Sequence, residues 1–232
     1  MERLDKRLAD TGKWSRKEAR ELIRAGRVAV GGAPCRAPEA KVGEDEPVTV
    51  DGAAIGGGGP VYLMLNKPAG VVSSTDEPGE RTVLDLLGAE YQNIGLFPAG
   101  RLDKDTEGLL LLTNDGPLAH RLLAPKSHVD KVYYVEVSGI LDQEDVEAVR
   151  QGMTLGDGYE CLPGELKLLS SNSAHITLHE GKYHQVKRML ASRGKPVTYL
   201  KRIKFGPLAL DESLPKGSWR PLSDKELKGI FS

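Results

Sequence analysis

The chain of 232 residues contains little cysteine and no long apolar run. Its two cysteines, Cys35 and Cys161, lie far apart and neither belongs to a Cys-x-x-Cys pair, which argues against a disulfide scaffold and a zinc finger. No apolar segment approaches the roughly 20 residues that a membrane helix requires, and residues 2–7 are mostly charged, unlike a secretory signal. We therefore expect a cytoplasmic protein without a membrane partner.

Signals for metals and cofactors are also missing. The five histidines show no tight ligand spacing, and no glycine-rich phosphate loop follows a predicted strand. Asp103, Asp105 and Glu107 imitate the first half of a calcium loop, but its twelfth position is Asn114 rather than glutamate. We therefore expect no metal site and no cofactor.

Charge is balanced over the whole chain but not along it. Lysine and arginine number 32 and aspartate and glutamate 33, and the net charge of −1 taken alone argues against a nucleic-acid partner. Residues 1–41, however, hold eleven basic and six acidic side chains, and residues 182–204 hold eight basic and no acidic ones. Tyr183, His184 and Tyr199 are interleaved with the second segment, which suits RNA whose bases stack and whose phosphates pair.

A run of four glycines and a proline at residues 56–60 interrupts the chain. Such a run cannot continue a helix or strand, so it predicts a linker between two domains, 1–59 and 60–232. The larger domain mixes strands and helices without a regular β-α-β rhythm, which predicts an α+β fold with a mainly antiparallel mixed sheet flanked by helices. Its predicted strands are residues 61–65, 109–113, 132–137, 174–178 and 197–205, and its predicted helices are residues 118–123, 142–150 and 183–192 and a short one capped at 223–226.

The small first domain combines one predicted helix with two short predicted strands, residues 27–32 and 47–52. The helix begins with a capping box at residues 15–18 and ends near Gly26. An arginine recurs every four residues along one side of it, at Arg16, Arg20 and Arg24. This stripe, with Lys17 beside it, is either a solvated face or a phosphate-binding surface, and its position on a small module favours the second.

Two segments of the larger domain are candidates for chemistry. The loop GRLDKDTEG at residues 100–108 carries five charged side chains directly before the apolar run that starts at Leu109. In residues 180–190, EGKYHQVKRML, helical spacing places Lys187 on the apolar side. A lysine at the edge of a core is costly unless it is paired, which predicts a carboxylate partner in the loop; the alternative is that its ammonium group reaches solvent.

These segments resemble the motifs of the pseudouridine synthases, and within them the RsuA-type family. Residues 100–110 resemble the signature around the catalytic aspartate, residues 131–135 resemble the K-x-Y-x-V strand, and residues 180–189 resemble the motif that carries the aspartate's basic partner. Residues 66–70 resemble the opening strand and turn, and the first domain, with R-L-D-K at residues 3–6, resembles the S4 RNA-binding fold. The resemblance spans nearly the whole chain in the order of the family.

The resemblance implies that the protein isomerises uridine to pseudouridine in structured RNA without a cofactor. The N1–C1′ bond of a flipped-out uridine breaks, the uracil turns, and C5 bonds to C1′. Asp103 is then the catalytic carboxylate, and Lys187 pairs with it, which keeps the carboxylate ionised and oriented towards the substrate. Tyr133 stacks on the uracil and helps to remove the C5 proton, while Arg101 opens the base stack or holds phosphate. The expected RNA-binding residues are Arg3, Lys6, Arg16, Lys17, Arg20, Arg24, Arg27, Lys182, His184, Gln185 and Arg188.

The identity of the target uridine is a separate question. The YHQVKR version at residues 183–188 resembles synthases that act on 16S ribosomal RNA, whereas large-subunit relatives tend to carry N-R-Q-V-R-R. We expect a monomer that binds ribosomal RNA of a small-subunit precursor or assembly intermediate, with a 23S uridine of the large subunit as the alternative. A non-catalytic ribosome-assembly protein is a further alternative, against which the set of Asp103, Tyr133 and Lys187 argues.

Overall fold

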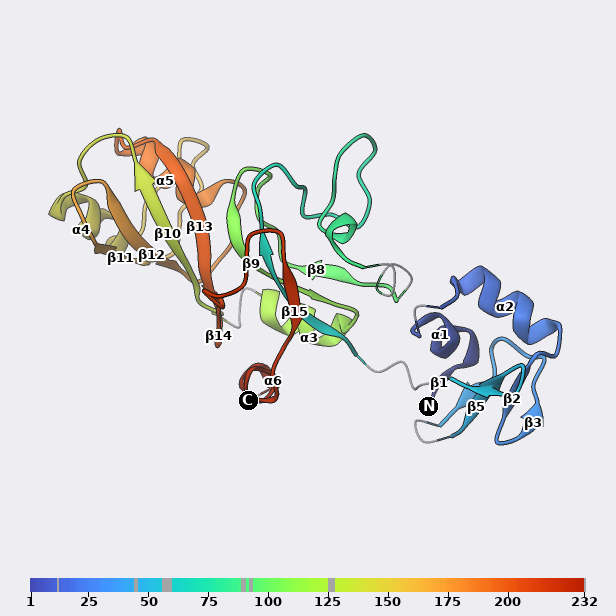
Figure 1. Cartoon of the computed structure of the whole chain (residues 1–232). Helices are drawn as coiled ribbons and strands as arrows, with labels where there is room; N and C mark the ends of the chain where they lie inside the picture. The colour runs from blue at the N-terminus through green and yellow to red at the C-terminus, as the bar shows by residue number, and fades with distance from the viewer. Residues whose placement is uncertain are drawn as a thin grey trace. The chain divides into compact units, whose positions relative to one another are not determined.

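The computed structural model describes residues 1–11, 13–43, 46–55, 60–88, 91, 94–124 and 128–231. The chain forms two compact units, which are coloured along the sequence in Figure 1. The first unit comprises Met1–Val61 and Leu84–Phe97, and the second comprises Tyr62–Val83 and Pro98–Ser232. The segment Leu84–Phe97 therefore groups with the first unit by its contacts, although in the sequence it lies between two segments of the second unit. Residues 56–59, the core of the predicted linker, lie outside the described residues.

The first unit combines helices α1 (Leu4–Ala9) and α2 (Arg16–Arg24) with short strands. The Ser15 side chain accepts from the Glu18 N–H and the Glu18 carboxylate accepts from the Ser15 N–H, which confirms the predicted capping box. The strands are β1 (Glu2–Arg3) paired with β4 (Lys41–Val42), and a sheet in the order β3 (Ala33–Pro34), β2 (Val28–Val30), β5 (Val48–Val50) and β6 (Ala53–Ala54). The antiparallel pairing of β2 with β5 confirms the predicted strand pair, and both helices and these strands share one apolar core.

The second unit is built on a mixed sheet, in agreement with the predicted α+β fold. The strands along it, in spatial order, are β11 (Glu165–Leu168), β12 (Ser173–Leu178), β10 (Lys131–Val137), β13 (Val197–Phe205), β9 (Glu107–Thr113), β7 (Tyr62–Lys67) and β15 (Trp219–Pro221). Two short strands join this sheet: β14 (Leu208–Ala209) pairs with β13, and β8 (Phe97–Ala99) pairs with β9. Figure 1 shows β11, β12, β10 and β13 side by side.

Strands β9 and β13 pair in parallel, and they meet over two residue pairs, Lys201 with Glu107 and Arg202 with Gly108. Gly108 has a φ of 100°, and a Cβ atom there would lie 2.2 Å from the carbonyl oxygen of Arg202. Only glycine therefore permits this close approach. The loop of residues 100–106 precedes β9, so this junction, which we call the seam, holds the end of the loop against β13.

The helices of the second unit start where the sequence provides caps. Asp115 caps α3 (Gly116–Leu123) by accepting from the Leu118 N–H, and Asp142 caps α4 (Gln143–Gln151). The helices α5 (Gln185–Ser192) and α6 (Asp224–Phe231) complete the set. The helix predicted over residues 183–192 begins two residues later than expected, because His184 has a left-handed backbone with a φ of 50° and the Gln185 side chain accepts from the Lys182 N–H.

None of the described helices has the length and apolar character needed to cross a membrane. Cys35 is half-buried and Cys161 is buried, and both are free thiols.

Candidate active site and RNA-binding surface

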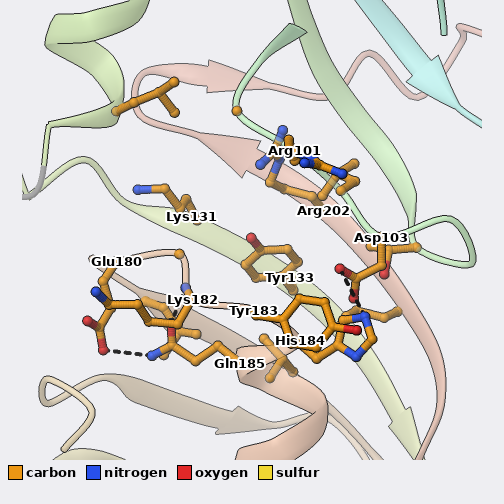
Figure 2. Close-up of a pocket in the computed structure, with 18 of the residues that line it drawn as sticks. Arg101, Asp103, Lys131, Tyr133, Glu180, Lys182, Tyr183, His184, Gln185 and Arg202 are labelled. Carbon is orange, nitrogen blue, oxygen red and sulfur yellow. Dashed lines mark hydrogen bonds and ion pairs between the residues drawn. The ribbon is translucent and has the colours of Figure 1, made fainter. Parts of the chain in front are cut away.

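A pocket of about 800 Å³ lies in the second unit, at the point where the loop of residues 100–104 faces strands β10 and β13 and the start of α5. Figure 2 shows the labelled side chains that converge on it. They are Arg101, Asp103, Lys131, Tyr133, Glu180, Lys182, Tyr183, His184, Gln185 and Arg202. The pocket thus brings Asp103, Tyr133 and Arg101 together with the 180–186 segment, as the sequence motifs require.

The Lys187 ammonium group on α5 pairs with the loop that precedes β9. Its Nζ lies 3.0 Å from Asp103 Oδ2 and 2.5 Å from Asp105 Oδ1. The structure therefore provides the carboxylate partner that the helical position of Lys187 predicted. His184 Nε2 adds a weaker contact, 3.6 Å from Asp103 Oδ1.

These contacts keep Lys187 charged. Burial lowers the pKa of Lys187, but its hydrogen bonds to Asp105 and Asp103 outweigh burial and raise it above the ordinary value. The hydrogen bond from Lys187 likewise lowers the pKa of Asp105. The side chains of Asp103 and Lys187 are 26% and 22% exposed, so a cation and a carboxylate meet at a site that is shielded yet reachable from the pocket.

Lys67 at the end of β7 fixes the backbone of the loop at Asp103 and after it. Its side chain is fully buried, and its Nζ donates to the carbonyl oxygens of Asp103 at 3.0 Å and Thr106 at 2.9 Å and also to those of Pro68 and Lys104. Burial lowers its pKa to about 8. Three of these four acceptors belong to the loop, so one ammonium group leaves the loop little freedom and positions the Asp103 carboxylate.

The Ser73 hydroxyl holds the residue before Asp103 in the same way. It accepts from the Leu102 N–H at 3.1 Å and donates to the Leu102 carbonyl oxygen at 2.8 Å. We did not expect Lys67 or Ser73 as site residues from the sequence. The Asn-Lys-Pro stretch was the available signal for Lys67, whereas nothing local marks Ser73.

The floor of the pocket is formed by two neighbouring strands. Tyr133 on β10 and Arg202 on β13 are direct cross-strand partners, and Lys131 on β10 is the partner of Phe205. Tyr133 is 9% exposed and Arg202 only 2%. The side chains of Lys131 and Tyr133 point to the same face of the sheet because they are two residues apart. Figure 2 shows Tyr133 between Lys131 and Arg202.

Glu180 organises the wall opposite the loop. Its carboxylate accepts from the Tyr159 hydroxyl at 2.5 Å, the Leu162 N–H at 2.9 Å and the Gln185 amide at 2.7 Å. The hydrogen bond to Glu180 raises the pKa of Tyr159 to about 12, so that phenol stays protonated. Gln185 is buried in this network, which places it in the wall of the pocket rather than on an open surface.

Several groups at the pocket remain accessible. Arg101 is exposed, and it makes no ion pair with any described residue. Tyr183 is 76% exposed and its ring stacks on His184 at 3.8 Å. The Lys182 ammonium lies over the Tyr159 ring at 4.7 Å, and Arg188 pairs with Asp157 at 2.6 Å. Cations and an open aromatic face are the groups that bind single-stranded RNA.

In the first unit, one buried carboxylate gathers three of the predicted RNA-binding arginines. Asp5 on α1 is 0% exposed, and its oxygens lie 3.0 Å from Arg3 Nε, 2.9 Å from Arg20 Nε and 3.7 Å from an Arg16 nitrogen. Burial raises the pKa of Asp5, but the hydrogen bonds from Arg3 and Arg20 outweigh it and lower the pKa to about 2. The three guanidinium groups are about half exposed, so they are held in place at the surface.

The other predicted RNA-binding residues of this unit differ in their partners. Lys6 pairs with Asp10 at 2.6 Å, and Arg27 pairs with Asp51. Lys17 and Arg24 are exposed and have no ion pair within the described part of the chain. The stripe that the helical spacing suggested is therefore divided: Arg16 and Arg20 turn towards Asp5, and Lys17 and Arg24 remain free.

Comparisons with known proteins agree with this geometry. Residues 61–192 match the model of the RNA pseudouridylate synthase family, and residues 2–48 match that of the S4 domain. The chain is 44% identical to an uncharacterized RNA pseudouridine synthase of Bacillus subtilis, over 97% of this chain and 96% of the relative. It is 41% identical to ribosomal small subunit pseudouridine synthase A of Pseudomonas aeruginosa (98% and 100%). It is 39% identical to ribosomal large subunit pseudouridine synthase B of Bacillus subtilis (99% and 96%).

A solved structure supports the same relationship. The crystal structure of a pseudouridylate synthase superposes with a TM-score of 0.70 at 34% sequence identity, covering 99% of this chain and all of that one. The similarity therefore extends over both units and is accompanied by the same kind of fold.

Proposed function

The chain belongs to the RNA pseudouridylate synthase family and carries an S4 domain, and from this premise we propose that it converts one uridine of 16S ribosomal RNA into pseudouridine with Asp103 as the catalytic carboxylate. The observation that carries the proposal is the ion pair of 3.0 Å between Lys187 and Asp103, which lines the pocket. A binding protein needs RNA contacts but has no need of a shielded, charged carboxylate beside an aromatic ring. This argues against a purely structural role in ribosome assembly.

The chemistry requires no cofactor because nothing is oxidised or reduced. The N1–C1′ bond breaks, a C5–C1′ bond forms, C5 gives up a proton, and N1 takes one up. A carboxylate beside C1′ and C6 of the uridine must be ionised to act, and the Lys187 ammonium places a positive charge 3.0 Å from Asp103. Lys67 and Ser73 fix the backbone of the loop, so the carboxylate does not have to be ordered during the reaction.

The base is held and turned between the loop and the floor. The ring of Tyr133 offers a stacking surface for the uracil, and its oxygen is the acceptor that we assign to the C5 proton. A uridine within a paired RNA must leave its stack to enter the pocket. Arg101, exposed at the rim, is placed to fill the gap or to bind a phosphate.

The RNA contacts come from both units. In the first unit we assign phosphate binding to Arg3, Arg16 and Arg20 around Asp5, to Lys17 and Arg24, and to Lys6 and Arg27. In the second unit Lys182 and His184 line the pocket, and Arg188, which pairs with Asp157, follows His184 on α5. We propose that the substrate is a small-subunit precursor or assembly intermediate in the cytoplasm, because the relative of Pseudomonas aeruginosa acts by name on the small subunit. A large-subunit uridine is the second candidate, since the relative named for that subunit is 39% identical.

The catalytic assignment is tested by Asp103→Asn. This variant should retain its fold and RNA affinity and lose pseudouridine formation, because an amide cannot supply the negative charge. Asp105→Asn is the matched control: Asp105 lies in the same loop and pairs with the same lysine, but its side chain is 74% exposed. Product is measured on ribosomal RNA from cells that lack the protein. Undiminished product with Asp103→Asn would remove the mechanism.

The target is tested by mapping pseudouridine in the ribosomal RNA of cells with and without the gene. We expect one position of the small-subunit RNA to lose its pseudouridine and to regain it when the wild-type protein is restored. Loss at a large-subunit position instead would establish the second candidate. An unchanged map would contradict both.

A further inference from the structure

Two cations are buried in the floor of the pocket, and neither has an ion pair with a described residue. Arg202 is 2% exposed and Lys131 is 8% exposed. Arg202 Nε donates to the Leu109 carbonyl oxygen at 2.8 Å, and Lys131 Nζ donates to the Val129 carbonyl oxygen at 2.7 Å. Neither group has a carboxylate oxygen within 4.0 Å among the described residues. The Nη2 atom of Arg202 is buried and has no hydrogen-bond partner among them.

The two positive charges also lie close to one another. The Arg202 guanidinium is 4.9 Å and the Lys131 ammonium 5.7 Å from the centre of the same ring, that of Phe205. Burial and the neighbouring Arg202 lower the pKa of Lys131. Two like charges on one aromatic ring are unfavourable in the absence of an anion.

The acidic groups on this side of the pocket are already bound elsewhere. Glu180 accepts three hydrogen bonds from Tyr159, Leu162 and Gln185, and Asp130 pairs with His179 at 2.9 Å. Both carboxylates act on Lys131 only at longer range. Asp103 is engaged by Lys187. The positive charge of the floor is thus not neutralised by the part of the protein that the structure describes.

Such an arrangement destabilises the empty pocket and becomes favourable when negative charge appears above it. A neutral uracil ring does not supply that charge. The reaction does, if the bond between base and sugar breaks so that its electron pair stays with the base. The negative charge then spreads from N1 over O2 and O4 of the ring.

We propose that Lys131 and Arg202 form an anion-stabilising floor that takes the negative charge of the uracil base after it separates from the ribose. The inference rests on the proposed function and assigns its high-energy intermediate. The N1–C1′ electron pair leaves with the base while C1′ bonds to a carboxylate oxygen of Asp103. The turned base then attacks C1′ through C5, which releases the carboxylate, and the proton on C5 leaves as N1 takes one up.

The test uses 5-nitrouracil, which is an anion at neutral pH, whereas uracil, which lacks the nitro group at C5, is neutral. The full-length protein should bind 5-nitrouracil roughly tenfold more tightly than uracil, since a partly buried charge interacts with an anion at an effective dielectric far below that of water. Absorbance reports ionisation of the nitro compound, so the bound ligand should remain anionic to lower pH than the free one. Competition by uracil identifies the common pocket.

Lys131→Met and Arg202→Met should each remove most of this preference, and Lys131→Arg should keep it. Lys204→Met is the matched control, because Lys204 lies on the same strand β13 but is exposed and does not line the pocket. Circular dichroism checks the fold of each variant. If Arg202→Met does not fold, the comparison of 5-nitrouracil binding by Lys131→Arg and Lys131→Met still tests the proposal.

Equal binding of 5-nitrouracil and uracil by the wild type, or an unchanged preference in Lys131→Met, would overturn the proposal. Displacement of 5-nitrouracil by inorganic phosphate at similar concentrations would overturn it too, since the floor would then bind a backbone phosphate. The measurement needs no RNA turnover. Its failure is therefore separate from failure of the proposed function, which the Asp103→Asn assay decides.

Discussion

Replacing Asp5 by asparagine tests how much the buried carboxylate stabilises the first unit. The substitution keeps the size of the side chain and removes the charge that Arg3, Arg16 and Arg20 share. Three guanidinium groups then face one another around a neutral amide. We expect a clear loss of stability, because removing one partner of a buried ionic network leaves the others unpaired.

The magnitude follows from the pKa. The hydrogen bonds lower the pKa of Asp5 from 3.8 to about 2, and at about 1.4 kcal/mol per pKa unit this is worth about 2 kcal/mol. A carboxylate with a lowered pKa stabilises the fold above its unfolded-state pKa, and the contribution is lost as the pH falls through the folded-state pKa. Asp5→Asn should therefore be about 2 kcal/mol less stable than the wild type near pH 7 and less than about 0.5 kcal/mol less stable near pH 2.

Trp14 provides the assay, because it packs against the core of this unit. The chain has two tryptophans, so Trp219→Phe leaves Trp14 as the single reporter. Urea unfolding followed by its fluorescence gives the free energy of unfolding at both pH values. Asp51→Asn is the matched control: its pair with Arg27 is half exposed and should contribute much less than the pairs of Asp5. Equal losses in the two variants, or a loss with Asp5→Asn that persists near pH 2, would refute the reasoning.

Two further predictions concern the seam and the free cations of α2. Gly108→Ala should lower the stability of the second unit by about 3 kcal/mol or more, because its Cβ would meet the Arg202 carbonyl oxygen at 2.2 Å. The control Gly194→Ala has open space around it and should lower the stability by only about 1 kcal/mol. Equal melting temperatures of the two variants would contradict this prediction. The double variant Lys17→Gln, Arg24→Gln should bind ribosomal RNA more weakly and reduce the slope of log K against log salt concentration by about 1.4. The control Lys225→Gln on α6 should leave both the affinity and the slope unchanged. An unchanged slope in the double variant would mean that neither cation contacts phosphate.

Local patterns predicted much of the secondary structure. The capping residues Ser15, Asp115 and Asp142 marked the starts of three helices because a cap depends on its neighbours in sequence. The alternation of residues 132–137 predicted β10 for the same reason. Periodicity even placed Lys187 on the apolar side of its helix and so required a carboxylate partner, which the structure provides.

What the sequence did not predict depends on register between distant strands. Tyr133 and Arg202 face each other only because β10 pairs with β13 in one particular register, which no local pattern determines. The hydrogen bond from Lys67 to the loop of Asp103 likewise joins two segments that are distant in sequence. The arginine stripe of α2 was similarly read from one helix alone, whereas Asp5 on α1 decides which of its arginines are bound.

The seam between β9 and β13 has a consequence for transplanting the activity. Asp103 is carried by the part of the sheet that contains β9, while Lys187 and Tyr133 belong to the part built around β13 and β10. The two parts meet at Gly108, where the backbones touch too closely for any other residue. A graft of residues 100–108 alone into another sheet would separate the carboxylate from its lysine. A portable module would have to include the loop, Lys67 of β7, the strand segments around Tyr133 and Arg202, and the helix that carries Lys187.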